Sequence, residues 1–158
     1  SMENYYNQLI DMANQIIEKQ MKNKKNEGVV IFFANKAKII IDKEYKKLEY
    51  NQIKYAKDGK IGEGTNFIEG FKAVIENGKN CDYLEYGKKF DLKRVLFLTD
   101  GNDSNYNKIK DICDKMKNLG YKLNIIGLGD LTYFQNLENF ASENCFYVKE
   151  KTIKFNNL

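Results

Sequence analysis

The chain has 158 residues, of which 42% are hydrophobic and 30% charged, a size and balance that suit one domain with its own core. No apolar run approaches the roughly 18 residues of a membrane-spanning helix, and the first residues lack a signal-peptide pattern. We therefore expect a single domain over residues 1–158, soluble and cytoplasmic, in a chain that has lost amino-terminal sequence. The absence of histidine excludes Ser-His-Asp and Cys-His triads and zinc sites that use histidine.

The net charge of +4 does not indicate a nucleic-acid site, because most of the lysines are scattered and Arg94 is the only arginine. The one clustered run, at 22–25, lies at a predicted helix end, where cations offset the helix dipole. Three cysteines without a C-x-x-C pair argue against a disulfide framework and a zinc ribbon. We expect buried, reduced thiols.

Helical and strand patterns alternate along the chain. A helical stripe over 6–17 precedes a strand over 28–33, which a three-residue link joins to a strand over 37–41. So short a link cannot hold a parallel crossover, so these strands should form an antiparallel hairpin. After a lysine-rich connection over 42–61, the pattern predicts a helix from Phe67, a strand over 94–99, a helix over 109–119 closed by Gly120, a strand over 122–127, a helix over 134–141 and a strand over 145–148. This order predicts an α/β fold with a doubly wound, mostly parallel sheet and one antiparallel edge hairpin.

The segment 94–104, RVLFLTDGNDS, combines an apolar strand with an acidic loop that contains a glycine. The strand has no polar alternation, which is typical of a strand buried on both faces of a parallel sheet. Asp100 falls at its carboxyl end, the edge at which ligands bind in open α/β sheets, and Gly101 allows a sharp turn there. The alternative interpretation is an ordinary strand-to-helix turn, in which Asp and Asn are favoured.

A second segment, GEGTNF at 62–67, lies at the start of the predicted second helix. Its glycines allow close backbone approach to a ligand, and the Thr65 hydroxyl can either cap the helix or coordinate a metal ion. Asn66 competes for the capping role, because it stands three residues before Glu69, as in a capping box. If Asn66 caps the helix, the Thr65 hydroxyl is left for another use.

Together, LTDG at 98–101 and GTN at 64–66 resemble the metal-ion-dependent adhesion site of the von Willebrand factor type A domain family. That site takes a D-x-S-x-S from the end of a first strand, a threonine from a Gly-Thr loop and an aspartate from a strand ending in T-D-G. Thr65 and Asp100 match the second and third parts. The early hairpin, the GLGD at 127–130 and the helix before the last strand also fall where this family has them, so the resemblance covers nearly the whole chain.

The first part of the motif is missing, since no D-x-S-x-S occurs and the chain opens with the helix that follows it in this family. Ser1-Met2 has two interpretations: the end of a D-x-S-x-S-M motif whose strand has been cut away, or a vector-derived serine before the initiator methionine. On either interpretation the remaining ligands are too few for firm binding of Mg²⁺ or another divalent cation. We expect weak binding or none by this chain.

The resemblance implies a non-enzymatic protein-binding module, in which a metal ion at the carboxyl edge of the sheet accepts an acidic side chain from a partner protein. Nucleic acid and membrane are not expected partners. The implied metal ligands are Thr65, Asp100 and Ser1. The residues expected to form the rim of the partner-binding surface are Gly64, Asn66, Asn102 and Asp103.

Two other functions stay open. A metal-assisted hydrolase or phosphoryl-transfer enzyme would use Asp100 and Asp103, whereas a scaffold domain would bind through another face without metal. Nucleotide-binding enzymes with glycine-rich loops are disfavoured, because there is no P-loop motif and GLG at 127–129 lacks the third glycine of a dinucleotide fingerprint.

The missing strand has a structural consequence, because in this family it lies between the 28–33 strand and the 94–99 strand. Its absence would leave two apolar inner edges with unpaired backbone groups, which are costly and prone to association. We expect a strand from outside the 158 residues to complement the sheet. The other candidates are a swapped dimer, the 152–155 segment, or direct pairing of the strands that carry Val30 and Phe97.

Overall fold

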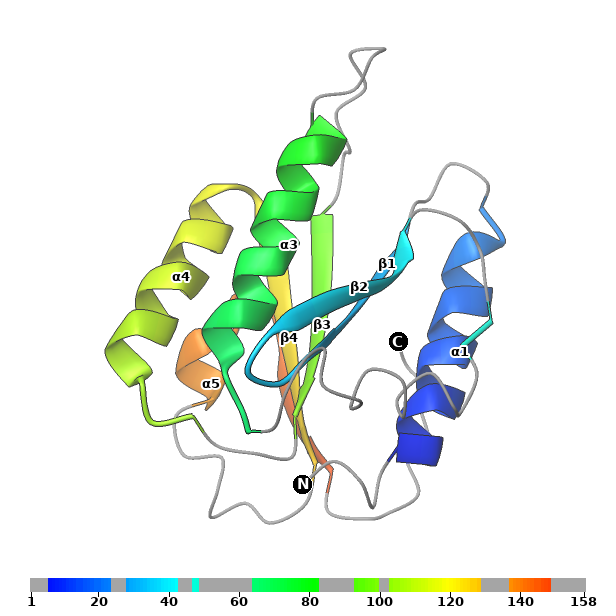
Figure 1. The fold of residues 1–158 in the computed structure, drawn as a ribbon, viewed down its shortest axis with the longest axis horizontal. Coiled ribbons are helices and arrows are strands. Elements are labelled where there is room, and N and C mark those ends of the chain that lie inside the picture. The colour runs from blue at the N-terminus through cyan, green and yellow to red at the C-terminus, as the bar shows by residue number, and fades with distance from the viewer. Residues whose placement is uncertain are drawn as a thin grey trace.

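The computed structural model describes residues 6–23, 28–42, 47–48, 64–82, 93–99, 103–128 and 137–148, so the predicted 42–61 connection lies almost entirely outside the described residues. The helices are α1 (Tyr6–Met21), α3 (Phe67–Asp82), α4 (Tyr106–Asn118) and α5 (Leu137–Phe140) (Figure 1). The strands are β1 (Val29–Phe33), β2 (Ala37–Asp42), β3 (Lys93–Thr99), β4 (Tyr121–Leu128) and β5 (Cys145–Val148). None of the described helices combines the length and apolarity that crossing a membrane requires.

A parallel sheet is formed by β3, β4 and β5, in this order. Pairing runs along the whole of β3, whose last residue, Thr99, lies beside Gly127 of β4. One face of the sheet carries Phe97, Leu123 and Ile125, which are buried against α3, α4 and α5. Because the three strands run in one direction, their carboxyl ends meet at a single edge.

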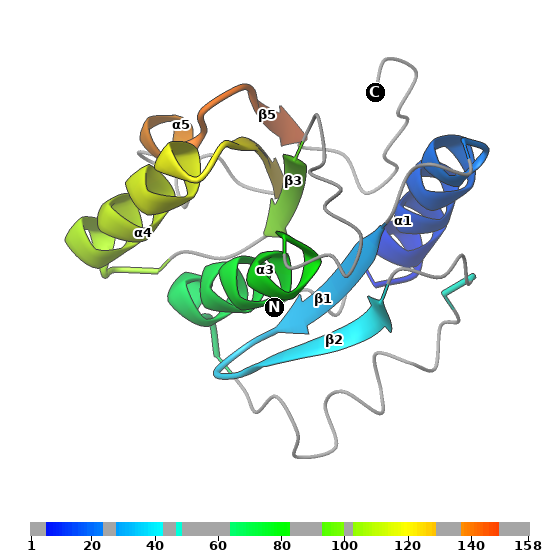
Figure 2. The ribbon, with the colours of Figure 1, turned by 90° about the horizontal axis from the view of Figure 1, so that it is seen from above.

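The strands β1 and β2 form a separate antiparallel hairpin through residues 34–36, as predicted. The hairpin lies between α1 and α3 (Figure 2). Val30 and Phe32 pack in a cluster with Ile10 of α1, whereas the Phe33 ring lies 3.1 Å from the position that a Cβ would take at Gly70 of α3. Packing against a helix on each face explains why β1 is an unbroken apolar run.

The predicted break in the sheet is present, because β1 and β3 belong to different sheets and Val30 and Phe97 are not on paired strands. Among the described residues, no strand joins the two sheets. Aromatic side chains make contact across the break instead: the rings of Phe33 in β1 and Phe97 in β3 stack with centroids 5.1 Å apart, and Phe67 of α3 meets both edge-on, at 6.2 Å from Phe33 and 5.0 Å from Phe97. Complementation of the sheet by a further strand stays a prediction.

The other predicted helices and strands are present; α5 spans Leu137–Phe140, and the N–H of Ala141, the last residue of the predicted helix, still donates to the Leu137 carbonyl at 3.4 Å. The first three residues of that prediction lie outside the described residues. The helix ends because the N–H groups of Ser142 and Glu143 donate to the Leu123 carbonyl, at 3.0 and 3.1 Å. This contact with the edge of β4 directs the chain into β5.

A polar cluster lies on the parallel sheet, away from the carboxyl edge. Arg94 donates twice to Glu143, from Nε to Oε2 and from Nη2 to Oε1, both at 3.1 Å. Asn124, only 3% exposed in β4, donates to the same carboxylate at 2.7 Å and accepts a bond from Asn144 at 3.1 Å. The hydrogen bonds from Asn124 and Arg94 hold the pKa of the Glu143 carboxyl below its ordinary value. The cluster thereby satisfies a buried amide that would otherwise destabilise the sheet.

Cys113 is buried in the core beside α3 and β4, as predicted for the thiols. Burial raises the pKa of its thiol to about 12. Cys113 and half-buried Cys145 are both free thiols, and the side chain of Cys81 lies outside the described residues.

Candidate functional site at the carboxyl edge

Three loops from distant parts of the chain meet at the carboxyl edge of the parallel sheet, below the end of β3. They are the hairpin tip at 34–36, the α3 loop at 64–66 and the α4 loop at 103–105. In Figure 1 this edge is at the lower end of the molecule, where α3 begins beside the hairpin tip. Thr99, which ends β3 directly before Asp100, is 3% exposed.

The α3 loop resolves the choice between Thr65 and Asn66 as the helix cap. The Asn66 side-chain oxygen accepts a hydrogen bond from the N–H of Glu69, at 3.4 Å, so Asn66 caps α3. Thr65 is half-buried, and its hydroxyl makes no hydrogen bond with any other described residue. Of the two candidates that the sequence left open, the structure selects Asn66, and Thr65 is not needed to start the helix.

The hairpin tip holds this loop in place from one side. The N–H of Asn66 donates to the Ala34 carbonyl at 3.1 Å. Gly64 has a φ of 99°, and a Cβ there would lie 2.9 Å from the side-chain oxygen of Asn35. A side chain at position 64 would therefore be strained in its backbone and too close to Asn35. The close approach that the glycine was predicted to allow is an approach to the hairpin tip.

Asp103 holds the same loop from the other side. Its Oδ2 accepts a hydrogen bond from the N–H of Phe67 and its Oδ1 one from the N–H of Asn105, both at 3.0 Å. The residue is 5% exposed. The sequence led us to expect Asp103 on the rim of a partner surface, whereas the structure buries its carboxylate between two loops.

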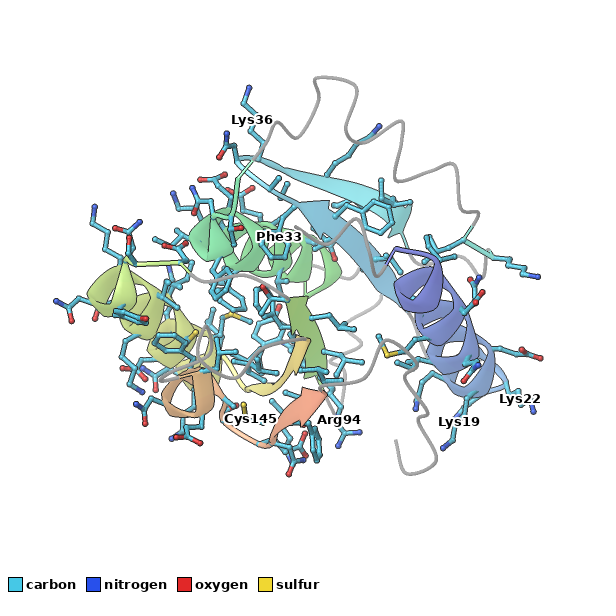
Figure 3. All side chains as sticks on the ribbon, turned by 90° about the horizontal axis from the view of Figure 1, so that it is seen from below. Lys19, Lys22, Phe33, Lys36, Arg94 and Cys145 are labelled. Carbon is cyan, nitrogen blue, oxygen red and sulfur yellow. The ribbon has the colours of Figure 1, made fainter. Side chains whose placement is uncertain are left out.

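The exposed residues of the three loops come from all three segments, and all but the glycine have polar side chains: Asn35, Lys36, Gly64, Ser104 and Asn105. Figure 3 shows Lys36 extending outward from the hairpin tip, away from the core in which Phe33 lies. The sequence reasoning did not include this tip in the site. The short link between two apolar strands, with Asn35 and Lys36 in it, could have indicated that the tip belongs to the site.

The described part of the edge is not by itself a metal site. No group of three or more His, Cys, Asp or Glu residues suited to a metal lies within the described residues. Asp103 uses both carboxylate oxygens on backbone N–H groups, so of the predicted residues that are described, Thr65 supplies one hydroxyl oxygen. A divalent cation needs several oxygen ligands. Ser1, Asp100 and Asn102 lie outside the described residues.

Sequence comparison identifies the family. The profile of the von Willebrand factor type A domain matches residues 1–158. The chain belongs to the von Willebrand factor type A family. Comparison with curated proteins gives no match.

Solved structures share the fold of this type A domain. Proximal thread matrix protein 1 (PTMP1) from the mussel byssus has a TM-score of 0.67 and 22% identity, over 94% of this chain and 39% of the PTMP1 chain. The SpRpn10 VWA domain has a TM-score of 0.64 and 15% identity, over 91% of this chain and 75% of its own. Manganese-loaded TRAP from Plasmodium vivax has a TM-score of 0.57 and 16% identity, over 80% of this chain and 51% of its own. This type A domain thus spans less than half of the PTMP1 chain, and the likeness is one of fold.

Proposed function

We propose that this type A domain is a protein-interaction module whose carboxyl edge holds a divalent cation and, through it, an acidic side chain of a partner protein. The observation that carries the proposal concerns Thr65. Asn66 caps α3 in its place, and the loop that bears Thr65 is tied through Asp103 to the segment just after Asp100. Thr65 and Asp100 are the proposed ligands, with Ser1 as a third.

Oxygen ligands of this kind suit Mg²⁺ or Mn²⁺. When bound, the cation supplies a coordination position that a carboxylate can occupy. Two neighbours in fold have been solved with a divalent metal, which supports the proposal: PTMP1 with a zinc-occupied metal-ion-dependent adhesion site (MIDAS) motif, and TRAP in a manganese-loaded form.

The charge of the described loops also suits an acidic partner. Lys36 is the one exposed cation on the three loops, and no carboxylate of their described residues is exposed, because Asp103 is buried. Complementary charge of this kind favours encounter with a negatively charged surface. We place Lys36 and Asn35 beside Gly64, Asn66 and Asn102 in the proposed partner surface. Burial of Asp103 also removes one of the two carboxylates on which the hydrolase alternative relied.

The break between β1 and β3 supports a second mode of association, in which an extended strand from a partner or a second copy pairs with β3. A dimer that shares strands would appear as concentration-dependent mass in sedimentation. A monomer in which the β3 amides exchange as slowly as those of β4 would contradict this mode.

Calorimetric titration with Mg²⁺ and Mn²⁺ tests the metal. We expect millimolar or weaker affinity for the 158-residue chain, and tighter binding after an upstream strand ending in D-x-S-x is added, because that strand supplies the missing oxygens. Thr65→Val, which removes only the hydroxyl, and Asp100→Asn should weaken binding, whereas Thr65→Ser should retain it. Tight binding by the shorter chain would show that the missing motif is unnecessary. Unchanged affinity in Thr65→Val and Asp100→Asn would instead favour a scaffold domain without a metal.

An aspartate-containing peptide, followed by NMR, tests the interaction itself. We expect shifts at residues 64–66 and at the hairpin tip only when metal and peptide are both present. Shifts that arise elsewhere, or without metal, would place the partner surface on another face.

A further inference from the structure

We infer that Asp103 is a positioning residue, which locks the loop bearing Thr65 onto the loop that follows β3. Its carboxylate bridges the start of α3 and the start of α4. The importance of this lock for ligand binding rests on the proposed function, whereas the two hydrogen bonds that form the lock do not depend on it.

Asp103 uses both of its carboxylate oxygens as hydrogen-bond acceptors. A local Asx turn needs one oxygen, and Oδ1 serves it by accepting the N–H of Asn105, two residues on. The other oxygen, Oδ2, accepts the N–H of Phe67, which is 36 positions away in the sequence. The second bond is therefore a tertiary link and not part of the turn. Both bonds have a charged acceptor at a buried site, where hydrogen bonds are strong.

The distant donor to Asp103 lies at the start of a helix, where N–H groups need an acceptor. Phe67 is the first residue of α3, and the first N–H groups of a helix have no acceptor within the helix. The Asn66 side chain already accepts the N–H of Glu69, so Asp103 accepts a different N–H at the same end of the helix. Phe67 itself is 1% exposed in the core. The lock thus fixes a rigid point two residues from Thr65.

The loop that bears Thr65 is held on both sides. The Ala34 carbonyl accepts the N–H of Asn66, and Asp103 accepts the N–H of the next residue, Phe67. Since consecutive Cα atoms are about 3.8 Å apart, two adjacent fixed amides leave Thr65 little freedom to move. A side chain that must act together with Asp100 is therefore held by a residue three positions after Asp100.

Hydrogen exchange of the unmodified protein, followed by NMR, gives a first test that needs no variant. We expect the Phe67 amide to be as protected as core amides of β4, although a first-turn amide ordinarily exchanges rapidly. Rapid exchange at Phe67 would overturn the proposal.

The second test compares Asp103→Asn with Asp114→Asn. Asn at 103 keeps one acceptor and turns an NH₂ group toward an N–H donor, whereas Asp114 is an exposed carboxylate paired with Lys110 on α4. We expect Asp103→Asn to lower protection of the Phe67 amide about 10- to 100-fold and to raise the mobility of the Thr65 methyl group. Protection of the Leu123 and Ile125 amides should change much less, and Asp114→Asn should change neither loop. An equal loss of protection at all amides would show that Asp103 stabilises the whole fold and does not position this loop. Unchanged mobility of the Thr65 methyl group would also refute the lock.

Mn²⁺ titration of the same samples separates this proposal from the function it serves. Weaker binding in Asp103→Asn, with no further loss when Thr65→Val is added, is the expected result for a residue that acts through Thr65. Loosened loops with unchanged affinity would overturn the positioning role. If neither the 158-residue chain nor the chain extended by an upstream D-x-S-x strand binds Mn²⁺ while the exchange data show the lock, the proposed metal function fails and the lock stands.

Discussion

Phe97 provides a test of how the hairpin and the parallel sheet are joined. It is 6% exposed, and its ring lies 4.6 Å from Phe71, 5.0 Å from Phe67 and 5.1 Å from Phe33, between ring centroids. Truncating a buried phenylalanine to alanine costs about 3–5 kcal/mol, through lost burial and the cavity that remains. Phe97→Ala should therefore remove a large part of the roughly 5–15 kcal/mol that stabilises an ordinary domain. Phe97→Leu keeps most of the volume and should cost about 1–1.5 kcal/mol.

The contact of Phe97 with Phe33 reports on how the hairpin is joined to the parallel sheet, because β1 and β3 are not paired by backbone hydrogen bonds. Stacked aromatic pairs contribute about 0.5–1.5 kcal/mol beyond their buried area. A double-mutant cycle with Phe33→Leu and Phe97→Leu should give a coupling energy in that range. The matched control is Phe140→Leu, whose ring stacks on Tyr106 and does not touch Phe33, and which should be additive with Phe33→Leu.

Urea unfolding followed by circular dichroism measures these free energies. A single transition with the expected coupling would show that the core of the parallel sheet and the cluster between α1 and the hairpin unfold together. Additive effects of Phe33→Leu and Phe97→Leu, or a separate earlier transition of α1 and the hairpin, would show that the stacked rings do not join the two parts. A loss below about 1 kcal/mol in Phe97→Ala would refute the packing argument.

Three further predictions concern packing and ionisation. Gly78→Ala should destabilise the protein by about 1–3 kcal/mol in urea unfolding, because the added Cβ would meet the Tyr121 hydroxyl. This cost outweighs a gain in helix propensity of about 1 kcal/mol. Equal losses of unfolding free energy on Gly78→Ala in the wild-type and Tyr121→Phe backgrounds would contradict the prediction. Cys113 should resist iodoacetamide at pH 8 in the folded state and react once unfolded, since burial raises its pKa to about 12 and keeps the thiolate scarce; rapid labelling of the folded chain, read by mass spectrometry, would count against this. The pKa of Glu143 is lowered in the folded state, so its stabilising effect is present above the ordinary glutamate pKa of about 4.3 and is lost as the pH falls through the lower folded value. Unfolding of wild type and Glu143→Gln should therefore differ at pH 7 and converge under acid, and a gap that persists at pH 3 would be inconsistent with the bonds from Asn124 and Arg94.

Local patterns in the sequence were sufficient for most of the helices and strands and for the family. The short link at 34–36 rules out a crossover, so the hairpin followed from chain geometry alone. Capping is also a local interaction, because the Asn66 side chain reaches an amide three residues away, although the sequence left open whether Thr65 or Asn66 makes the cap. The motifs LTDG and GTN depend on residues that are neighbours in sequence, and they predicted the family that the profile match confirms.

The role of Asp103 was decided by tertiary structure. A sequence shows an aspartate after a strand, which is equally consistent with an exposed rim residue, but it does not show that the Phe67 amide lies within 3.0 Å. The same holds for Gly64, whose φ of 99° and closeness to Asn35 arise from contact between two loops. The path of the chain after α5 is also tertiary, since the N–H groups of Ser142 and Glu143 donate to the Leu123 carbonyl of β4. In each case the deciding partner is distant in the sequence, and only folding brings the two groups to hydrogen-bonding or van der Waals distance, where their energies become large enough to override local preference.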